Sequence, residues 1–336
     1  MSDLIPSEEE TARIFDEQIL PIVFPNAPSP ARPSLVLLAG QPGAGTSRAT
    51  AQMLADSPTD MVVLNGDDLQ VFHPNFLALA RSRSAEAPQL LSQSTASWAR
   101  SCLRHARTIG RSLLVDGSFH SPEVALRTAD LFAHQGFATR VVVVATPRAE
   151  SLLAAASRYL LDAQGGRASR FTSVGAHDAD WNSTRALIGE LEATPSVDKL
   201  TVIGRDGRAC FDAERTAPEG FAGATRALLR EQSASMSSGF AMRWMSELRS
   251  MTDYALAAGQ ASRPLAELLI ELHGVALNEV LSQLALPAHS KARPAAEANL
   301  ARRLTELRRA APAVPRGEDL AAPAVSPIQP DRGISR

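Results

Sequence analysis

Residues 40 to 47, with the sequence GQPGAGTS, have the residue types and the spacing of a loop that binds phosphate groups. Gly40, Gly43 and Gly45 allow successive backbone N–H groups to converge on phosphate oxygens, and a helix that begins at the end of the loop adds the positive end of its dipole. The hydroxyl of Ser47 stands where such a loop binds Mg²⁺. The predicted nucleotide-binding set is the whole loop: Gly40, Gln41, Pro42, Gly43, Ala44, Gly45, Thr46 and Ser47.

The loop departs from the pattern G-x-x-x-x-G-K-[ST] at one position, because Thr46 occupies the place of the lysine. The only lysines of the chain, Lys199 and Lys291, are far from the loop in sequence. A lysine at this position stabilises the negative charge of the phosphoryl group during transfer, and loss of one such contact costs about 3–4 kcal/mol. Since the backbone of the loop does most of the binding, we expect nucleotide binding to survive and phosphoryl transfer to be slowed.

Carboxylates follow two of the other apolar runs. Asp67 and Asp68 come after "MVVL", and Asp116 ends "SLLVD". The carboxyl ends of parallel strands meet at the edge of the sheet where ligands bind. Asp67 is therefore the candidate general base that accepts the proton of an attacking hydroxyl, whereas we interpret Asp68 as a helix N-cap. Asp116 either binds Mg²⁺ or holds the acceptor, and the alternative is a turn residue before Gly117.

Two arginines and two histidines complete the set of candidate residues. Arg158 and Arg170 lie in and just after a predicted helix, and a phosphoryl-transfer site needs cations near the γ-phosphate. His73 and His120 have no partner at the spacing of metal ligands, which favours ordinary polar contacts over a metal site.

A parallel sheet is needed to bring these residues together. Helical stretches near residues 85–109, 121–135 and 149–163 separate the apolar runs, and Asp206-Gly207 predicts the turn of a hairpin. Strands that alternate with helices predict an α/β fold with a doubly wound, mostly parallel sheet, similar to P-loop NTPases. The runs are nearly continuous, as in strands covered on both faces: residues 35–38, 61–64, 112–117 and 138–146.

Composition divides the chain into four predicted parts. Residues 1–33 form a helix capped by Ser7 and a proline-rich linker, and residues 34–214 form the sheet domain with the phosphate loop. Residues 215–311 have amphipathic helical spacing and predict a C-terminal helical extension. Residues 312–336 are rich in proline and alanine without periodicity, which predicts a disordered tail.

The overall composition is that of an ordinary globular protein, with 45% hydrophobic and 21% charged residues. A formal net charge of −2 gives no electrostatic reason to expect nucleic acid or an anionic membrane as a partner. No apolar run approaches the ~20 residues that span a membrane, the acidic N-terminus does not resemble a signal peptide, and two cysteines without motif spacing indicate a reducing compartment. We therefore expect a cytoplasmic protein.

Several stretches together resemble the zeta toxin family, the kinases of bacterial toxin–antitoxin modules. The combination of a phosphate loop with "DDLQVFHPNF" is specific to this resemblance, which spans residues 7–207. The matching stretches occur in the order of the family: "SEEETARIFDEQILP", "GQPGAGTS", "LNGDDLQVFHPNF", "LLVDGSFHSPE", "SRYLLDAQGGRASRFTSVGAHD" and "TVIGRDG".

The resemblance implies a kinase that uses ATP and Mg²⁺ to phosphorylate the 3′-hydroxyl of UDP-N-acetylglucosamine or a related nucleotide sugar. In that reading Asp67 is the general base. Asp116 and Ser118 bind the acceptor, and His120 lies in the acceptor site where some members have an arginine. The resemblance also implies that a small helical antitoxin covers the N-terminal helix.

By the same resemblance, Arg158 and Arg170 grip the γ-phosphate. Thr46 in place of the family's lysine leaves two other functions open. One is a catalytically weak pseudokinase that binds nucleotide or an antitoxin. The other is a small-molecule phosphotransferase with a different alcohol as acceptor, because one fold hosts many acceptors.

Overall fold

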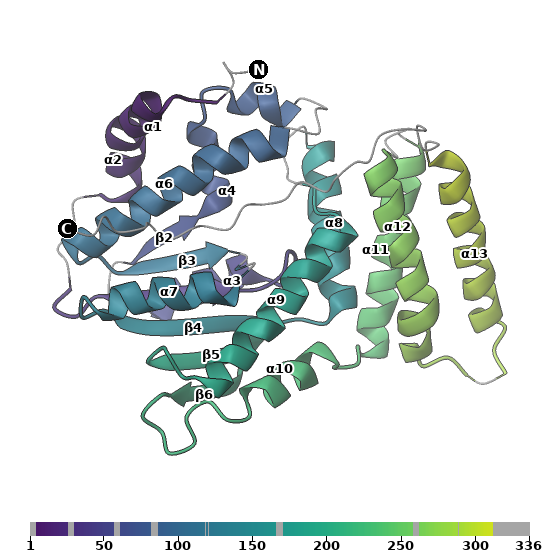
Figure 1. Cartoon of the computed structure of the whole chain (residues 1–336). Helices are drawn as coiled ribbons and strands as arrows, with labels where there is room; N and C mark the ends of the chain where they lie inside the picture. Colours follow the sequence, from purple (N-terminus) through teal and green to yellow (C-terminus); the bar gives the residue numbers. More distant parts are fainter. Residues whose placement is uncertain are drawn as a thin grey trace.

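The computed structural model describes most of the chain, and in that part a single sheet of six strands lies at the centre (Figure 1). The described residues are 5–25, 30–56, 61–81, 87–117, 119, 121–165, 171–257, 262–287 and 289–311. The strands are β1 (Ser34–Ala39), β2 (Val62–Asn65), β3 (Leu113–Gly117), β4 (Ala138–Ala145), β5 (Lys199–Gly204) and β6 (Ala209–Glu214). Their order is β2-β3-β1-β4-β5-β6, and only the pair β5 and β6 is antiparallel. The predicted α/β fold with a doubly wound, mostly parallel sheet is confirmed.

Both faces of the sheet are covered, which explains the nearly continuous apolar runs. Leu35, Leu37 and Ala39 of β1 belong to the larger core, whereas Val36 and Leu38 pack on the face of α3 (Thr46–Asp56). The helices that contribute buried residues to the larger core include α6 (Ala87–Ile109), α7 (Pro122–Ala133), α9 (Val174–Ala193) and α10 (Ala224–Gln232). Because β1 lies between β3 and β4, the phosphate loop leaves the middle of the sheet at its carboxyl edge.

The hairpin predicted at Asp206-Gly207 joins β5 to the edge strand β6. Gly207 has a φ of +85°, and the side chain of Asp206 accepts a hydrogen bond from the backbone of Arg208 at 3.0 Å. The left-handed backbone conformation and the Asx-type bond are both typical of a tight turn.

The N-terminal helix begins as predicted. The Ser7 side chain caps α1 (Glu8–Ile14) by accepting a hydrogen bond from the backbone of Glu10. A π-helical turn (Phe15–Ile19) and α2 (Leu20–Val23) continue it. The indole nitrogen of Trp98 in α6 donates to the carbonyl of Thr11 at 3.0 Å, so Trp98 packs α1 against α6, as a structural tryptophan does.

The remaining helices form two groups. Short helices follow β2: α4 (Gly66–Leu69), a 3₁₀ turn (Gln70–Phe72) and α5 (Phe76–Arg81). The second group is α8 (Arg148–Gln164), α11 (Ser238–Ala257), α12 (Arg263–Val275, extended by turns at Ala276–Val280 and Leu281–Gln283) and α13 (Ala292–Ala310). These four helices share a second hydrophobic core, and in Figure 1 α11, α12 and α13 stand beyond α8, away from the sheet.

None of the helices in the described segments is both long enough and apolar enough to cross a membrane. The predicted tail at residues 312–336 lies outside the described residues.

Candidate active site

The phosphate loop has a backbone conformation that requires glycine at two positions. Gly43 and Gly45 have φ values of +80° and +103°, in the left-handed region. A Cβ atom on Gly43 would also lie 2.1 Å from the backbone oxygen of Ser151 in α8. The loop is therefore pressed against the first turn of α8, and a side chain at Gly43 would push the two apart.

Hydrogen bonds to Thr146 and Ser151 hold the loop in place. The side-chain amide of Gln41 donates to the carbonyl of Thr146 at 2.9 Å and to Oγ of Ser151 at 3.1 Å, while the Thr146 hydroxyl donates to the carbonyl of Ala44 at 2.8 Å. Oε1 of Gln41 is buried and has no hydrogen-bond partner among the described residues. The first amide groups of α3 have no intrahelical partner. The loop therefore has the form of a cradle for an anion.

Asp116 lies beside the start of α3, as the sheet register requires. It pairs with Leu38 of β1 on one side and with Asn65 of β2 on the other. Its carboxylate is hydrogen-bonded to the side chain of Thr46 and accepts a hydrogen bond from Asn65 at 3.4 Å. Thr46, in the position of the lysine, thus contacts Asp116, the residue that the sequence predicts to bind Mg²⁺ or the acceptor.

Asp67 and Asp68 occupy the first turn of α4 and are exposed. The interpretation of Asp68 as N-cap is wrong, because the side chain of Asn65 caps α4 by accepting a hydrogen bond from the backbone of Asp67 at 2.9 Å. The helix starts at Gly66, three residues earlier than a cap at Asp68 would give, so the capping position falls on the last residue of β2. Burial and the negative charge of Asp67 raise the pKa of Asp68.

Three charged side chains lie near Asp116. Asp67, Asp68 and Arg158 are all close enough to Asp116 to shift its pKa, the two carboxylates upward and the guanidinium downward. Arg158 lies on the exposed face of α8. The structure therefore brings Asp67, Asp116, Thr46 and Arg158 together at the carboxyl edge of the sheet. The other three predicted residues, Ser118, His120 and Arg170, lie outside the described residues.

Burial raises the pKa of Asp116 to about 6, above the ordinary aspartate value of 3.8. Because Asp116 holds its proton more tightly in the folded protein than in the unfolded chain, its contribution to the free energy of unfolding falls as the pH rises from about 4 to about 6. Asp116→Asn should remove this slope and raise the free energy of unfolding at pH 7 by about 1–3 kcal/mol, since one pKa unit is worth about 1.4 kcal/mol.

Denaturant unfolding of the metal-free protein at pH 4 to 8, with a chelator present, measures this effect. Asp206→Asn, in the exposed β5–β6 turn, should keep the slope of the parent protein. If the free energy of unfolding of Asp116→Asn depends on pH as it does in the parent protein, the pH dependence does not come from Asp116.

Sequence reasoning missed one cation beside the loop. Arg205 follows β5 at the same carboxyl edge, and its Cγ lies 3.9 Å from the position that a Cβ of Gly45 would take. Its guanidinium pairs with Glu150 of α8 at 3.3 Å. The sequence pattern that pointed to Asp67, a charged residue just after a parallel strand, also points to Arg205.

No histidine of the described part takes part in a metal cluster. His73 is buried, its Nδ1 accepts a hydrogen bond from the backbone of Asn75 at 3.1 Å, and burial lowers its pKa. In the residues that the structure describes, no group of three or more His, Cys, Asp or Glu side chains is arranged to hold a metal ion. Mg²⁺ usually takes only one or two ligands from the protein and the rest from phosphates and water. The oxygens of Ser47 and Asp116 fit such a partial site.

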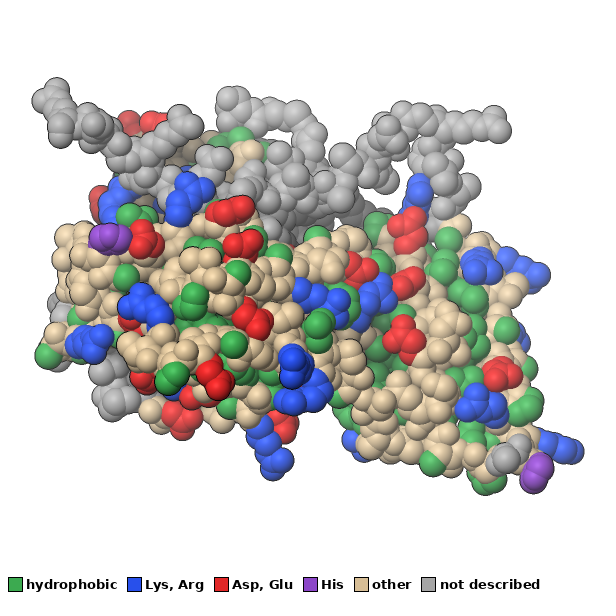
Figure 2. Space-filling model, turned by 60° about the horizontal axis from the view of Figure 1, so that its bottom comes forward, with side chains coloured by type: hydrophobic (Ala, Val, Ile, Leu, Met, Phe, Trp, Pro, Cys, Tyr) green, Lys and Arg blue, Asp and Glu red, His purple; other side chains and the backbone are tan. Residues whose placement is uncertain are grey.

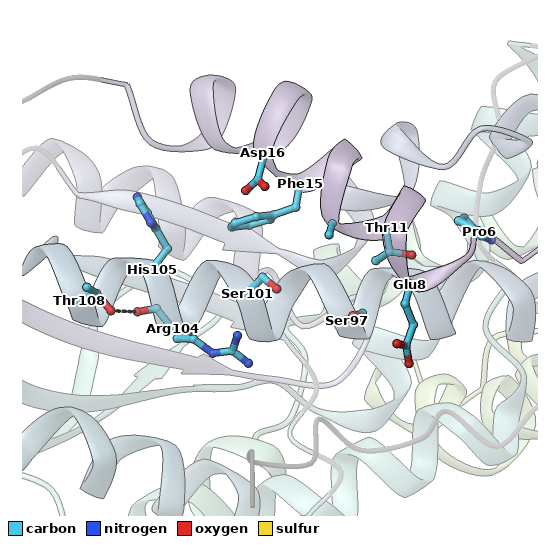
Figure 3. A pocket seen from close by; sticks show the side chains of 11 residues that line it. Pro6, Glu8, Thr11, Phe15, Asp16, Ser97, Ser101, Arg104, His105 and Thr108 are labelled. Carbon is cyan, nitrogen blue, oxygen red and sulfur yellow. Dashed lines mark hydrogen bonds between the residues drawn. The ribbon is translucent and has the colours of Figure 1, made fainter. Parts of the chain in front are cut away.

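A cavity of about 550 Å³ lies away from the phosphate loop, between α1 and α6. Figure 3 shows Thr11, Phe15 and Asp16 on one side of it and His105 and Ser101 of α6 on the other. On the face of the molecule in Figure 2, acidic and basic side chains are interspersed.

Comparison with known proteins gives consistent results. The family model described as Zeta toxin matches residues 22–216. Toxin zeta of Enterococcus hirae is 22% identical over 185 residues, which are 55% of this chain and 65% of that toxin. Toxin PezT of Streptococcus pneumoniae is 22% identical over 184 residues, 54% of this chain and 73% of PezT.

A solved structure from the PezAT chromosomal toxin–antitoxin system of Streptococcus pneumoniae has a similar fold. The TM-score is 0.64 at 19% sequence identity, and the match covers 74% of this chain and 98% of the solved chain. At this identity the likeness concerns the fold.

Proposed function

This chain belongs to the zeta toxin family, and from that membership we propose that it is a kinase that transfers the γ-phosphate of ATP to the 3′-hydroxyl of UDP-N-acetylglucosamine or a related nucleotide sugar. The match spans 65% of the length of toxin zeta of Enterococcus hirae. The activity, the acceptor and the partner are therefore proposals about this chain.

One observation carries the proposal. The glycine loop, Asp116 and Arg158 converge at the carboxyl edge of the sheet, with Asp67 near enough to act electrostatically on Asp116. A phosphoryl-transfer site needs these parts together: an anion cradle, a carboxylate for the attacking hydroxyl and a cation for the phosphates.

The proposed chemistry is a single displacement. The sugar hydroxyl oxygen forms a bond to the γ-phosphorus while the bond from that phosphorus to the β–γ bridging oxygen breaks. The hydroxyl proton passes to a carboxylate oxygen of Asp67, and ADP leaves with the electron pair. Arg158 and Arg170 hold the γ-phosphate, and Asp116, Ser118 and His120 hold the acceptor. Mg²⁺, bound through Ser47 and Asp116, would neutralise negative charge on the phosphates.

The contact between Thr46 and Asp116 supports a second candidate function. Where a lysine would present a cation to the phosphates, the structure has a hydroxyl that is bonded to a carboxylate. Nucleotide binding through the backbone with little turnover, as in a pseudokinase, fits this arrangement.

Mass spectrometry of UDP-N-acetylglucosamine after incubation with the protein, ATP and Mg²⁺ tests the main proposal. We expect a product heavier by one phosphoryl group. Binding of magnesium–ATP in calorimetry without any phosphorylated sugar would favour the pseudokinase, and a phosphorylated alcohol from a panel of other acceptors would favour a different phosphotransferase. Absence of magnesium–ATP binding would contradict all three.

Arg205 should contribute to nucleotide binding, because it is the cation packed against Gly45. We expect Arg205→Ala to raise the dissociation constant of magnesium–ATP by about tenfold, the effect of one charge-assisted contact at a half-exposed site. Arg208→Ala in the same turn, where the side chain is 91% exposed, is the matched control and should leave it unchanged. Equal affinities of the two variants in calorimetry would exclude Arg205 from the site.

For the partner, we propose a small helical antitoxin that covers α1. The PezAT structure comes from a toxin–antitoxin system, and the cavity between α1 and α6 provides a hollow surface along the N-terminal helix. Because ATP and nucleotide sugars are found in the cytoplasm, we propose that the protein acts there.

A further inference from the structure

The phosphate loop rests on the first turn of α8 rather than on the sheet alone. Gly43 lies so close to the backbone of Ser151 and Ala155 that no Cβ fits between them, and Gln41 donates a hydrogen bond to Oγ of Ser151. Any displacement of this turn therefore displaces residues 41–43. The position of the loop depends on what holds α8.

A buried relay connects Ser151 to α9. Oγ of Ser151 lies 2.9 Å from Nε2 of His177, and Nδ1 of His177 lies 3.1 Å from the carboxylate of Asp178. A carboxylate only accepts, so Nδ1 carries the proton and Nε2 of the neutral ring accepts the proton of the Ser151 hydroxyl. Burial lowers the pKa of His177, in agreement with a neutral ring. Ser151 is then free to accept the hydrogen bond from Gln41.

The relay has the residue types of a nucleophilic triad, but its geometry assigns it another role. Ser151 and His177 have no exposed surface, and Oγ of Ser151 is already occupied by Gln41. A substrate has no access to this hydroxyl, so the relay positions the loop.

Helices α11 and α12 also contact the first turn of α8. Arg148, the first residue of α8, binds Asp178 through two hydrogen bonds of 2.8 Å and pairs with Glu271 of α12 at 2.9 Å. The indole nitrogen of Trp244 in α11 donates to the carbonyl of Ala149 at 3.0 Å. Both helices lie beyond residue 216, outside the segment that the family model matches.

We propose that α11 and α12 set the conformation of the phosphate loop through the first turn of α8, with Glu271, Arg148 and Asp178 as positioning residues. Contacts between charged and hydrogen-bonded groups in one network are coupled energetically. Weakening the outer contact between Glu271 and Arg148 therefore loosens the loop.

Hydrogen exchange of the ligand-free protein, followed by mass spectrometry, tests the coupling without reference to activity. Glu271→Gln keeps the shape of the side chain and removes its charge, and Ser151→Ala removes the hydroxyl next to the loop. In both variants we expect the amides of residues 40–47 to exchange about three- to tenfold faster, while peptides from β1 keep their rate. Glu267→Gln is the matched control, because Glu267 lies one turn away on α12 and pairs with Arg263 of the same helix at 2.9 Å.

Loop exchange that is unchanged in Glu271→Gln would overturn the proposal, and so would equal acceleration in every peptide, because that is general destabilisation. The consequence for nucleotide affinity rests on the proposed function: Glu271→Gln should raise the dissociation constant of magnesium–ATP about threefold or more, and Glu267→Gln should not. If the loop exchanges faster in Glu271→Gln but the wild-type protein binds no ATP, the coupling is supported and the proposed function is contradicted. The two failures are therefore distinguishable.

Discussion

Replacing Thr46 by lysine should raise the rate of phosphoryl transfer from ATP to UDP-N-acetylglucosamine by about a hundredfold or more. The reason is electrostatic, because negative charge spreads over the phosphoryl group during transfer and a fixed cation at the end of the loop stabilises that charge. The backbone cradle is already present in the wild type. We therefore expect the dissociation constant of magnesium–ATP to change far less than kcat.

The structure adds a second reason. Thr46 begins α3 and its side chain is bonded to Asp116, the carboxylate that sequence analysis assigns to Mg²⁺ or the acceptor. A lysine removes this bond and offers Asp116 an ammonium group as partner instead. Since burial disfavours the ionised form of Asp116, a neighbouring cation also lowers its pKa from about 6. At neutral pH the carboxylate is then more completely ionised and better suited to its role.

Single-turnover measurements with labelled ATP check this prediction, with Thr46→Met as the control. Methionine is about as long and flexible as lysine but carries no charge, so it should give no gain. An unchanged rate in Thr46→Lys would show that another cation already supplies the missing charge. Arg158, Arg170 and Arg205 are then the residues to replace, one at a time.

Asp67→Asn should lower the rate of phosphoryl transfer by a factor of about 10² to 10⁴, the usual contribution of a positioned general base. Asparagine keeps the size of the side chain but cannot accept the proton of the sugar hydroxyl at neutral pH. The affinity for magnesium–ATP should stay within about twofold of the parent, because the cradle for the phosphates is the backbone of residues 40–47.

The comparison is best made in the Thr46→Lys protein, where the faster reaction leaves room to measure a large decrease. Asp68→Asn is the matched control, since Asp68 is the next residue of the same exposed turn. If both variants lose activity equally, the effect comes from the charge of the turn and Asp67 is not the base. Full activity in Asp67→Asn would assign the proton transfer to another group.

The sequence by itself predicted the sheet and the loop, because both depend on local patterns. Continuous apolar runs give strands that are covered on both faces, and the spacing of Gly40, Gly43 and Gly45 gives the turn between β1 and α3. The cap at Ser7 and the turn at Asp206-Gly207 are local in the same sense and are confirmed. The roles of the individual site residues stay predictions.

The tertiary structure decided which groups touch each other. Sequence reasoning placed the cap of α4 at Asp68, but the end of β2, set by pairing with β3, puts Asn65 there. The contact of Thr46 with Asp116 joins residues 70 positions apart, and no local pattern encodes it.

The same holds for Arg205 beside Gly45 and for the contacts that lead from Glu271 through Arg148, Asp178 and His177 to Ser151. Local propensity depends on neighbours in the chain and is readable from one sequence. Contacts between distant residues depend on sheet order and on how helices pack, and these follow from burying the whole apolar surface at once.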